Sequence, residues 1–182
     1  MVKLTLPAVA VADTHTPTPA GRLVVPGFTM PARDVWVDEV MVQRLLLAAR
    51  DASERAYAPF SQFRVGAAAL MDNDAKHTIF TGANVENSSY GGTICAERTA
   101  LTAAASAGFR RLRYIAVCVR DALDAPLCDR SPCGLCRQFM RQFCEPQAAS
   151  PSLIFVADGQ PDTLAQVMDI ERLLPWGFRF SK

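Results

Sequence analysis

Cys95-Ala96-Glu97 is one of two short segments that decide this fold, and Cys133-Gly134-Leu135-Cys136 is the other. Their three thiols supply three of the four corners of a tetrahedral zinc site. Structural zinc sites close all four corners with protein ligands, whereas catalytic sites leave one corner for water. Glu97 stands two residues from the first thiol and is not needed as a ligand. The pattern therefore indicates a catalytic zinc centre with a carboxylate that can carry protons.

Both segments are predicted to lie at helix N-termini. Ser131 is interpreted as the N-cap and Pro132 as the first position of a helix over 133–144. An Ala-rich stretch predicts a second helix over 95–107, which Gly108 ends. The positive ends of the two helices would then point at one ion and favour thiolates.

Three thiolates against one Zn²⁺ leave the site with an excess negative charge. Arg98 follows Glu97 directly, and we expect its guanidinium to hydrogen-bond the sulfurs and offset that charge.

Two alternatives to a catalytic centre remain. A C-x-x-C pair can be a redox pair, but the accompanying thioredoxin-like βαβ pattern is absent from this sequence. A closed structural zinc site would need a fourth ligand. The candidates for it are Cys118, Cys128, Cys144, His15 and His77. Cys118 lies in an apolar run and is predicted to be a buried strand residue, while Cys128 and Cys144 flank the second helix and leave Glu97 unexplained.

The remaining pattern predicts an α/β fold in one domain, 37–182, that follows an N-terminal extension, 1–36. The extension is rich in Thr, Pro and Val, lacks a steady period, and need not be fully ordered. Helices are predicted over 37–57, 95–107, 133–144 and 170–174, and Asp169 is predicted to cap the last one. Strands are predicted over 65–71, 78–84, 114–119, 152–157 and 163–168. A polar turn at Asp72-Asn73-Asp74 is predicted to join the first two strands. Helices alternating with strands imply a three-layer α/β/α sandwich with a five-stranded mixed, mostly parallel sheet.

Composition argues against several classes of partner. Nineteen basic and eighteen acidic residues give a net charge of +1, and no basic stretch follows one face, so nucleic acid is not an expected partner. No apolar run approaches the ~20 residues of a membrane span. The N-terminus lacks the layout of a secretion signal. We therefore expect a cytoplasmic protein, in which disulfides are disfavoured.

Longer stretches around the two segments resemble the cytidine deaminases of pyrimidine salvage. These stretches are Ala56–Ala68, Asn84–Tyr90, Cys95–Ala100, Pro132–Gln138 and Leu173–Phe178. The resemblance runs in order through most of the chain. It implies a cytidine deaminase-like fold and a hydrolase that converts cytidine and deoxycytidine to uridine and deoxyuridine with release of ammonia. It also implies one zinc ion per subunit, held by Cys95, Cys133 and Cys136.

The resemblance also assigns roles to individual residues. Glu97 would be the catalytic proton carrier. Asn84 and Glu86 would hold the ribose hydroxyl, since a carboxylate beside an amide accepts and donates hydrogen bonds. Phe63 would stack on the base, the backbone of Ala96 would hydrogen-bond the pyrimidine carbonyl, and Tyr90 would be a further substrate-binding position. Arg98 and Gln138 would be supporting positions.

The same resemblance predicts a homotetramer with shared active sites. Family members of this subunit size whose first zinc ligand is Cys are homotetramers. In them the phenylalanine at the position of Phe178 closes over the base in the adjoining subunit. The chain end is apolar at Trp176 and Phe178, where a monomer would normally be polar and frayed. Burial against a neighbour would resolve that conflict.

Two related activities stay open as alternatives. A deaminase of another small aminopyrimidine nucleoside, such as a nucleoside antibiotic, would share both zinc segments, although such relatives lack the Asn84-x-Glu86 pattern. A polynucleotide cytidine deaminase would share the zinc chemistry. Those enzymes usually carry His as the first ligand and basic, aromatic strand-binding loops, which this sequence does not show.

Overall fold

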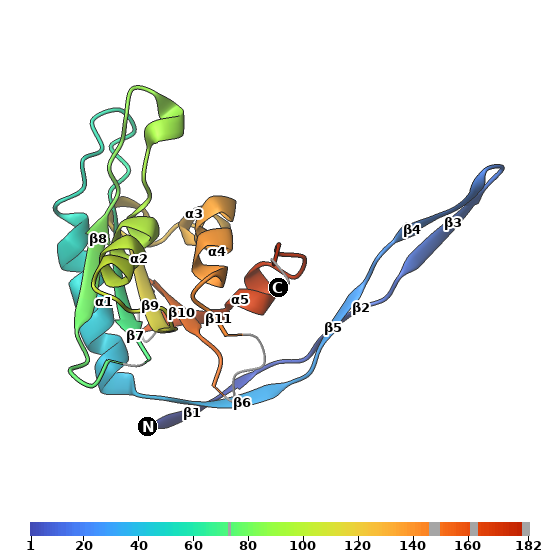
Figure 1. The fold of residues 1–182 in the computed structure, drawn as a ribbon, viewed down its shortest axis with the longest axis horizontal. Helices are drawn as coiled ribbons and strands as arrows, with labels where there is room; N and C mark the ends of the chain where they lie inside the picture. Colours follow the sequence, from blue (N-terminus) through green and yellow to red (C-terminus); the bar gives the residue numbers. More distant parts are fainter. Residues whose placement is uncertain (73, 146–149, 161–163, 180–182) are drawn as a thin grey trace. The chain divides into compact units, whose positions relative to one another are not determined.

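Five strands form a mixed sheet in the order β11-β10-β9-β7-β8 (Figure 1). Their bounds are β7 Val65–Met71, β8 Ile79–Ala83, β9 Leu112–Val119, β10 Leu153–Ala157 and β11 Ala165–Asp169. The computed structural model describes residues 1–72, 74–145, 150–160 and 164–179. Asn73 of the predicted turn and Thr163 of the predicted last strand therefore lie outside the described residues.

The prediction of a mixed five-stranded sheet is confirmed, but the prediction that it is mostly parallel is wrong. Only β9 and β10 pair in parallel, whereas β7–β8, β7–β9 and β10–β11 pair antiparallel. The reason lies in the connections. Short loops can join only antiparallel neighbours, and they link β7 to β8 and β10 to β11. A parallel pair needs a long crossover, and the chain between β9 and β10 supplies one.

Helices cover both faces of this sheet, which confirms the three-layer arrangement. Helix α1 (Glu39–Ser53) packs on one face, and α2 (Ala96–Ser106) packs on the other. Two glycines permit the close approach. A Cβ on Gly66 would lie 1.9 Å from the carbonyl oxygen of Ala49 in α1, and a Cβ on Gly82 would lie 2.4 Å from the backbone nitrogen of Ala100 in α2.

The second predicted zinc helix lies on the α2 side of the sheet. It is α4 (Gly134–Arg141), which packs against α2. The core beneath both helices contains Leu101, Ile115, Met140 and Ile154, all fully buried. Burying such side chains contributes ~1.5–3 kcal/mol each. This packing fixes the two helix N-termini over the same end of the sheet.

Four short elements complete the described part of the domain. They are the α-helices α3 (Leu127–Arg130) and α5 (Ile170–Leu173) and the 3₁₀ helices η1 (Tyr90–Gly92) and η2 (Arg120–Ala122). The predicted cap of α5 is confirmed, because the Asp169 carboxylate accepts a hydrogen bond from the Arg172 N–H at 2.8 Å. The described helices include none with the length and apolar character needed to span a membrane.

The chain divides into two compact units, Met1–Asp38 and Glu39–Lys182. The first unit, called the N-terminal ribbon below, consists of three antiparallel strand pairs. They are β1 (Val2–Leu6) with β6 (Arg33–Val37), β2 (Val9–Val11) with β5 (Phe28–Met30), and β3 (Thr14–Thr18) with β4 (Gly21–Val25). The sequence predicted no element here, because prolines and glycines interrupt the alternation that marks a strand.

Candidate active site

Cys95, Cys133 and Cys136 form one cluster at the N-termini of α2 and α4. Their sulfur atoms all lie within 4.8 Å of one another, and those of Cys95 and Cys133 are 3.9 Å apart. A tetrahedral zinc ion with Zn–S distances of ~2.3 Å places its sulfurs about 3.8 Å apart. The three thiols therefore fit one zinc ion.

No fourth protein ligand closes this cluster among the residues that the structure describes. The three cysteines are the only group of three or more potential metal ligands found there. Cys118 is buried on β9, as predicted, and Cys144 is buried beyond the end of α4. Cys128 lines the neighbouring pocket but does not belong to the cluster. The donor set is therefore that of an open, catalytic site.

Both helices begin at a zinc-cluster cysteine. Cys95 is the N-cap of α2 and Cys133 the N-cap of α4, so the prediction that two helix N-termini point at the cluster is confirmed. The prediction of Ser131 as N-cap and Pro132 as first helical residue is wrong. Ser131 instead ends α3, and its hydroxyl lies 3.1 Å from the Nη2 of Arg137, which donates to it.

The electrostatics around Cys95 favour its thiolate. A hydrogen bond from the Cys136 thiol and the nearby Arg98 guanidinium lower the pKa of Cys95 to about 5. The Nη2 of Arg98 lies 3.9 Å from the Cys95 sulfur and also donates to the Thr93 carbonyl at 2.7 Å. The predicted contact between Arg98 and a cluster sulfur is thus present, and the Thr93 carbonyl holds the guanidinium in place.

Glu97 lies in the first turn of α2, buried beside the cluster. Burial raises the pKa of its carboxyl group to about 7. A carboxyl group with a pKa near the working pH can both accept and release a proton, which is the requirement for a general acid and base. Its side chain also lines the pocket described next.

A pocket of about 410 Å³ opens beside the thiol cluster. Six of the predicted site residues line it: Phe63, Asn84, Glu86, Cys95, Glu97 and Cys133. Cys136 lies behind them, fully buried in α4, and Ala96 is the buried first residue of α2. The structure therefore gathers residues from three distant segments of the chain around one cavity.

Asn84 is fixed by the backbone on either side of Arg64. Its Oδ1 accepts the Val65 N–H at 2.8 Å, and its Nδ2 donates to the Phe63 carbonyl at 2.9 Å. Since an amide has two N–H donors, one remains for a ligand. Asn84 thus presents a pre-oriented donor to the pocket.

Glu86 is fixed by the loop that precedes Phe63. Its Oε2 accepts the backbone N–H groups of Phe60 at 2.9 Å and Ser61 at 3.2 Å, and its Oε1 accepts the Ser61 hydroxyl. The Ser61 hydroxyl is the main cause that holds the pKa of Glu86 below its usual value. Glu86 therefore stays an ionised acceptor with lone pairs left for a ligand hydroxyl.

The loop before β7 carries local strain beside Phe63. Gln62 has a φ of 58°, in the left-handed region that non-glycine residues seldom occupy. Its N–H donates to the Ala58 carbonyl at 3.0 Å, which closes the loop, and the Ser61 hydroxyl accepts the Phe63 N–H at 3.0 Å. Strain of this kind persists where surrounding contacts over-determine the backbone.

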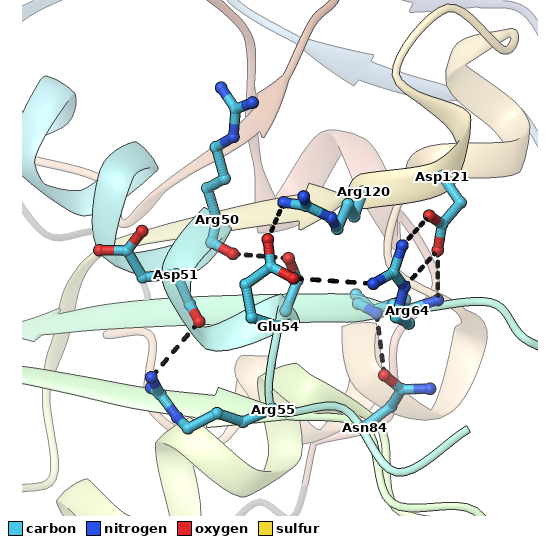
Figure 2. Close-up of polar contacts among 10 residues, drawn as sticks. Arg50, Asp51, Glu54, Arg55, Arg64, Asn84, Arg120 and Asp121 are labelled. Atoms are coloured by element: carbon cyan, nitrogen blue, oxygen red, sulfur yellow. Dashed lines mark hydrogen bonds and ion pairs between the residues drawn. The ribbon is translucent and has the colours of Figure 1, made fainter. Parts of the chain in front are cut away.

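An ion-pair network anchors the same loop from the outside (Figure 2). The Nε of Arg64 donates to the Oδ2 of Asp121 at 3.0 Å, and its Nη2 pairs with the Oδ1. Glu54, which directly follows α1, lies 3.6 Å from the Arg64 guanidinium and also pairs with Arg120. Figure 2 shows this network next to the contact that holds Asn84.

Three predicted site residues lie away from both the thiol cluster and this pocket. Tyr90, on η1, is 83% exposed, and Phe178 is 65% exposed. The side-chain amide of Gln138 bonds the backbone of Phe178 at both its carbonyl and its N–H. None of the three appears among the residues that line the pocket.

Some residues of the pocket could not be found by pattern alone. Arg130 lines it while buried, with its Nε donating to the Ala125 carbonyl at 2.7 Å. Arg137 lies in the stretch Pro132–Gln138 but had no predicted role; it also lines the pocket and donates to the Pro132 carbonyl at 2.6 Å. Ser61 had a weak signal in the stretch Ala56–Ala68, but its contact with Glu86 depends on the folded loop.

Comparison with known proteins gives one consistent result. Residues 40–149 match the model of the cytidine and deoxycytidylate deaminase zinc-binding region. The cytidine deaminase of Halalkalibacterium halodurans is 40% identical over 136 residues, which span 75% of this chain and 92% of that protein. The cytidine deaminase of Sporosarcina psychrophila is 46% identical over 103 residues, or 57% and 70% of the two chains.

A solved structure agrees with these relatives. The crystal structure of cytidine deaminase from Burkholderia pseudomallei superimposes with a TM-score of 0.61 at 39% identity, and the match covers 74% of this chain and 97% of that chain. The thiol cluster and Glu97 both fall inside the region that the family model matches. The chain belongs to the cytidine deaminase family.

Proposed function

We propose that this pocket catalyses the hydrolytic deamination of cytidine and deoxycytidine to uridine and deoxyuridine, with release of ammonia. One observation carries the proposal: a single cavity combines an open three-thiol cluster, a buried carboxyl group and a fixed amide–carboxylate pair. The relatives, which are cytidine deaminases, support the same reaction.

The thiol cluster is the proposed zinc site. When bound there, zinc supplies the Lewis acidity that makes a water molecule nucleophilic near neutral pH. Cys95, Cys133 and Cys136 would hold the ion, and Arg98 would offset part of the negative charge of the thiolates. The absence of a fourth protein ligand among the described residues leaves room for the reacting water.

Glu97 is the proposed proton carrier. Its carboxylate would accept a proton from water and give it to ring N3 of the base, which makes C4 more electrophilic. After the water oxygen has added to C4, Glu97 would move the remaining hydroxyl proton to the exocyclic amine, which leaves as ammonia. A positioned carboxyl group contributes ~10²–10⁴-fold to such proton transfers. Its pKa of about 7 suits both directions of transfer.

Side chains and one backbone N–H group around the pocket would hold the nucleoside. Asn84 would donate its spare N–H to the ribose 3′-hydroxyl, and Glu86 would accept a charge-assisted hydrogen bond from that hydroxyl. Phe63 would stack on the base. The backbone N–H of Ala96, which lies in the first turn of α2 and has no helical carbonyl to bond, would read the pyrimidine carbonyl. Cytidine and deoxycytidine both carry the 3′-hydroxyl, so both are proposed substrates.

We further propose a homotetramer located in the cytoplasm. Exposed Trp176 and Phe178 support a shared interface, because a monomer would leave both large rings in water. The described cysteines are all free of disulfides, and a reducing compartment would keep the zinc-binding thiols in that state.

Ammonia release from cytidine, deoxycytidine and free cytosine tests the proposed reaction directly. We expect turnover of both nucleosides and little turnover of cytosine, since cytosine cannot use the binding energy at Asn84 and Glu86. Turnover of none of the three would contradict the proposal. Equal turnover of cytosine and cytidine would remove Asn84 and Glu86 from the assigned sugar site.

A further inference from the structure

The N-terminal ribbon is an addition to the family domain, whose matched region begins at residue 40. A single register runs through it, from Val2 opposite Val37 to Thr18 opposite Gly21, so the ribbon is one long hairpin. Figure 1 shows it as a twisted two-stranded ribbon. A lone two-stranded hairpin is at best marginally stable in water, and independent stability needs three or more strands with an apolar face.

The outer end of the ribbon exposes a continuous apolar strand. On β4, Leu23 is 67% exposed and Val25 68% exposed, and Val24 between them is exposed as well. Exposed apolar strand edges are pairing sites for another chain. The outer end of the ribbon therefore presents a surface that another strand can cover.

Charge narrows the class of partner. Between Val9 and Met30 the sequence contains one acidic residue, Asp13, and one Lys or Arg residue, Arg22. Nucleic acids and anionic membranes bind clusters of Lys and Arg, which this segment lacks. An apolar, nearly neutral β-strand edge fits the segment better, and a second copy of this chain always supplies one.

At the outer end of the ribbon, formed by β3 and β4, the two free strand edges are not equivalent. The sheet of β3 and β4 has two strands, so each strand has one outer edge. Pro17 on β3 lacks an N–H, and a proline within a strand places that position on the outer side. Pro17 is opposite Arg22, so the backbone N–H and C=O of Arg22 also point outward. Because successive pairs alternate along an antiparallel ladder, those of Val24 point outward from β4 as well. The edge of β4 is complete, whereas that of β3 is interrupted.

We propose that β4 pairs antiparallel with β4 of a second copy, about a twofold axis at Leu23. Arg22 of each copy then lies opposite Val24 of the other, and these outward-facing residues exchange two hydrogen bonds per pair. Leu23 of one copy lies opposite Leu23 of the other, in the non-hydrogen-bonded pair between these two hydrogen-bonded pairs. The result is a four-stranded sheet with β3 on each outer edge. It has more than the three strands that independent stability requires, whereas a lone hairpin has two.

Neighbouring registers are less favourable. A twofold axis at Arg22 would place two guanidinium groups directly opposite each other, and like charges in that position destabilise a strand pair. An axis at Val24 would place Arg22 opposite Pro26, which has no N–H to donate. Leu23 is the centre that avoids both costs.

Disulfide trapping of the full-length, zinc-loaded protein tests this pairing. In Leu23→Cys the two thiols would meet in a close pair with Cα atoms about 4.5 Å apart, which is within the reach of a disulfide. Thr16→Cys is the matched control, because Thr16 is opposite Leu23 in the same ribbon. Two Thr16 residues would be three strand spacings apart, about 14 Å. We expect covalent dimers from Leu23→Cys alone, at a level above that of the wild-type cysteines.

A second pair of variants separates edge pairing from damage to the hairpin. Val24→Pro and His15→Pro each remove an outward N–H, and neither removes a bond between β3 and β4. In the Leu23→Cys background, Val24→Pro should abolish the covalent dimer and His15→Pro should retain it. Equal trapping of Leu23→Cys and Thr16→Cys, absence of any Leu23→Cys dimer, or equal effects of the two prolines would overturn the proposal. Ammonia release is measured in parallel, so that a failure of the pairing is distinguishable from a failure of the proposed reaction.

Discussion

The side-chain amide of Gln138 binds the backbone of Phe178 at two points. Its Nε2 donates to the Phe178 carbonyl at 3.0 Å, and its Oε1 accepts the Phe178 N–H at 3.1 Å. The backbone is thus held against α4 while the ring stays 65% exposed and outside the pocket of its own chain. This arrangement suits a ring that acts on a neighbouring subunit.

Complementation between two inactive chains is the first prediction. Glu97→Gln lacks the proton carrier, and Phe178→Ala lacks the ring but keeps its backbone. If Phe178 closes over the base of an adjoining subunit, a mixed oligomer contains sites that combine Glu97 of one chain with Phe178 of the other. Deamination by the mixture, measured as ammonia release, should exceed the average of the two parents.

The complementation experiment needs proof of subunit exchange, for which native mass spectrometry of differently tagged chains suffices. Gln138→Ala is a useful companion variant, because it removes the two hydrogen bonds to the Phe178 backbone while the chain keeps the Phe178 ring. No gain of activity after exchange, or a fully active monomer, would refute the shared site.

Metal binding should depend on Cys133 but not on Cys128. Both residues line the pocket, yet only Cys133 belongs to the thiol cluster. We expect one zinc per chain in the wild type and in Cys128→Ser, and a large loss of zinc in Cys133→Ser, measured by elemental analysis. Removal of zinc by a chelator should abolish turnover, and returned zinc should restore it. Loss of zinc from Cys128→Ser would show that the site is closed by a fourth thiol.

Glu97→Gln should retain zinc and lose at least ~10²-fold in kcat, since it keeps the shape of the side chain but removes its proton transfer. The matched control is Glu39→Gln, an exposed carboxylate in the first turn of α1. Its turnover should equal that of the wild type. Substantial deamination by Glu97→Gln would assign the proton transfers to another group.

Glu86→Gln should raise the KM for cytidine roughly tenfold or more, because a neutral acceptor replaces a charged one at the sugar. Since the pKa of Glu86 is held below its usual value, the carboxylate is ionised at neutral and mildly acidic pH, and the difference between variant and wild type should persist there. Ser61→Ala separates two effects, because it loosens the hold on Glu86 without changing its charge. If Glu86→Gln left the KM unchanged while Ser61→Ala raised it, Glu86 would serve the loop alone.

The zinc segments were predictable because their information is local. Thiol spacing and a nearby Glu97 indicate a metal site without knowledge of the fold, and the Ala-rich stretch after Cys95 sets the start of α2 within one residue. The start of α4 was misplaced, because the Ser131 hydroxyl is taken by Arg137, a contact that depends on the folded loop.

Strand order and the N-terminal ribbon depend on pairing across long stretches of sequence. The short apolar runs of β7 and β9 indicate that they are buried strands, but not that β9 lies between β7 and β10. In the ribbon, apolar side chains such as Val11 and Leu23 fall on opposite faces of the hairpin, so no single face shows a continuous pattern. Only the pairing itself reveals the element.

Asp121→Asn should raise the KM for cytidine by no more than about fivefold while leaving kcat and zinc content unchanged, because partly exposed ion pairs contribute little. Asp121 holds Arg64, and the backbone on both sides of Arg64 holds the Asn84 amide, so weaker anchoring should reach the sugar site and spare the metal. Asp72→Asn is the matched control, because it breaks the ion pair of Asp72 with Arg111, a partly exposed pair that does not line the pocket. Steady-state kinetics at two salt concentrations provide the measurement, and added salt should narrow the difference between wild type and Asp121→Asn. A fall in kcat instead of a rise in KM, or an equal effect of Asp72→Asn, would contradict a role for Asp121 in positioning Asn84.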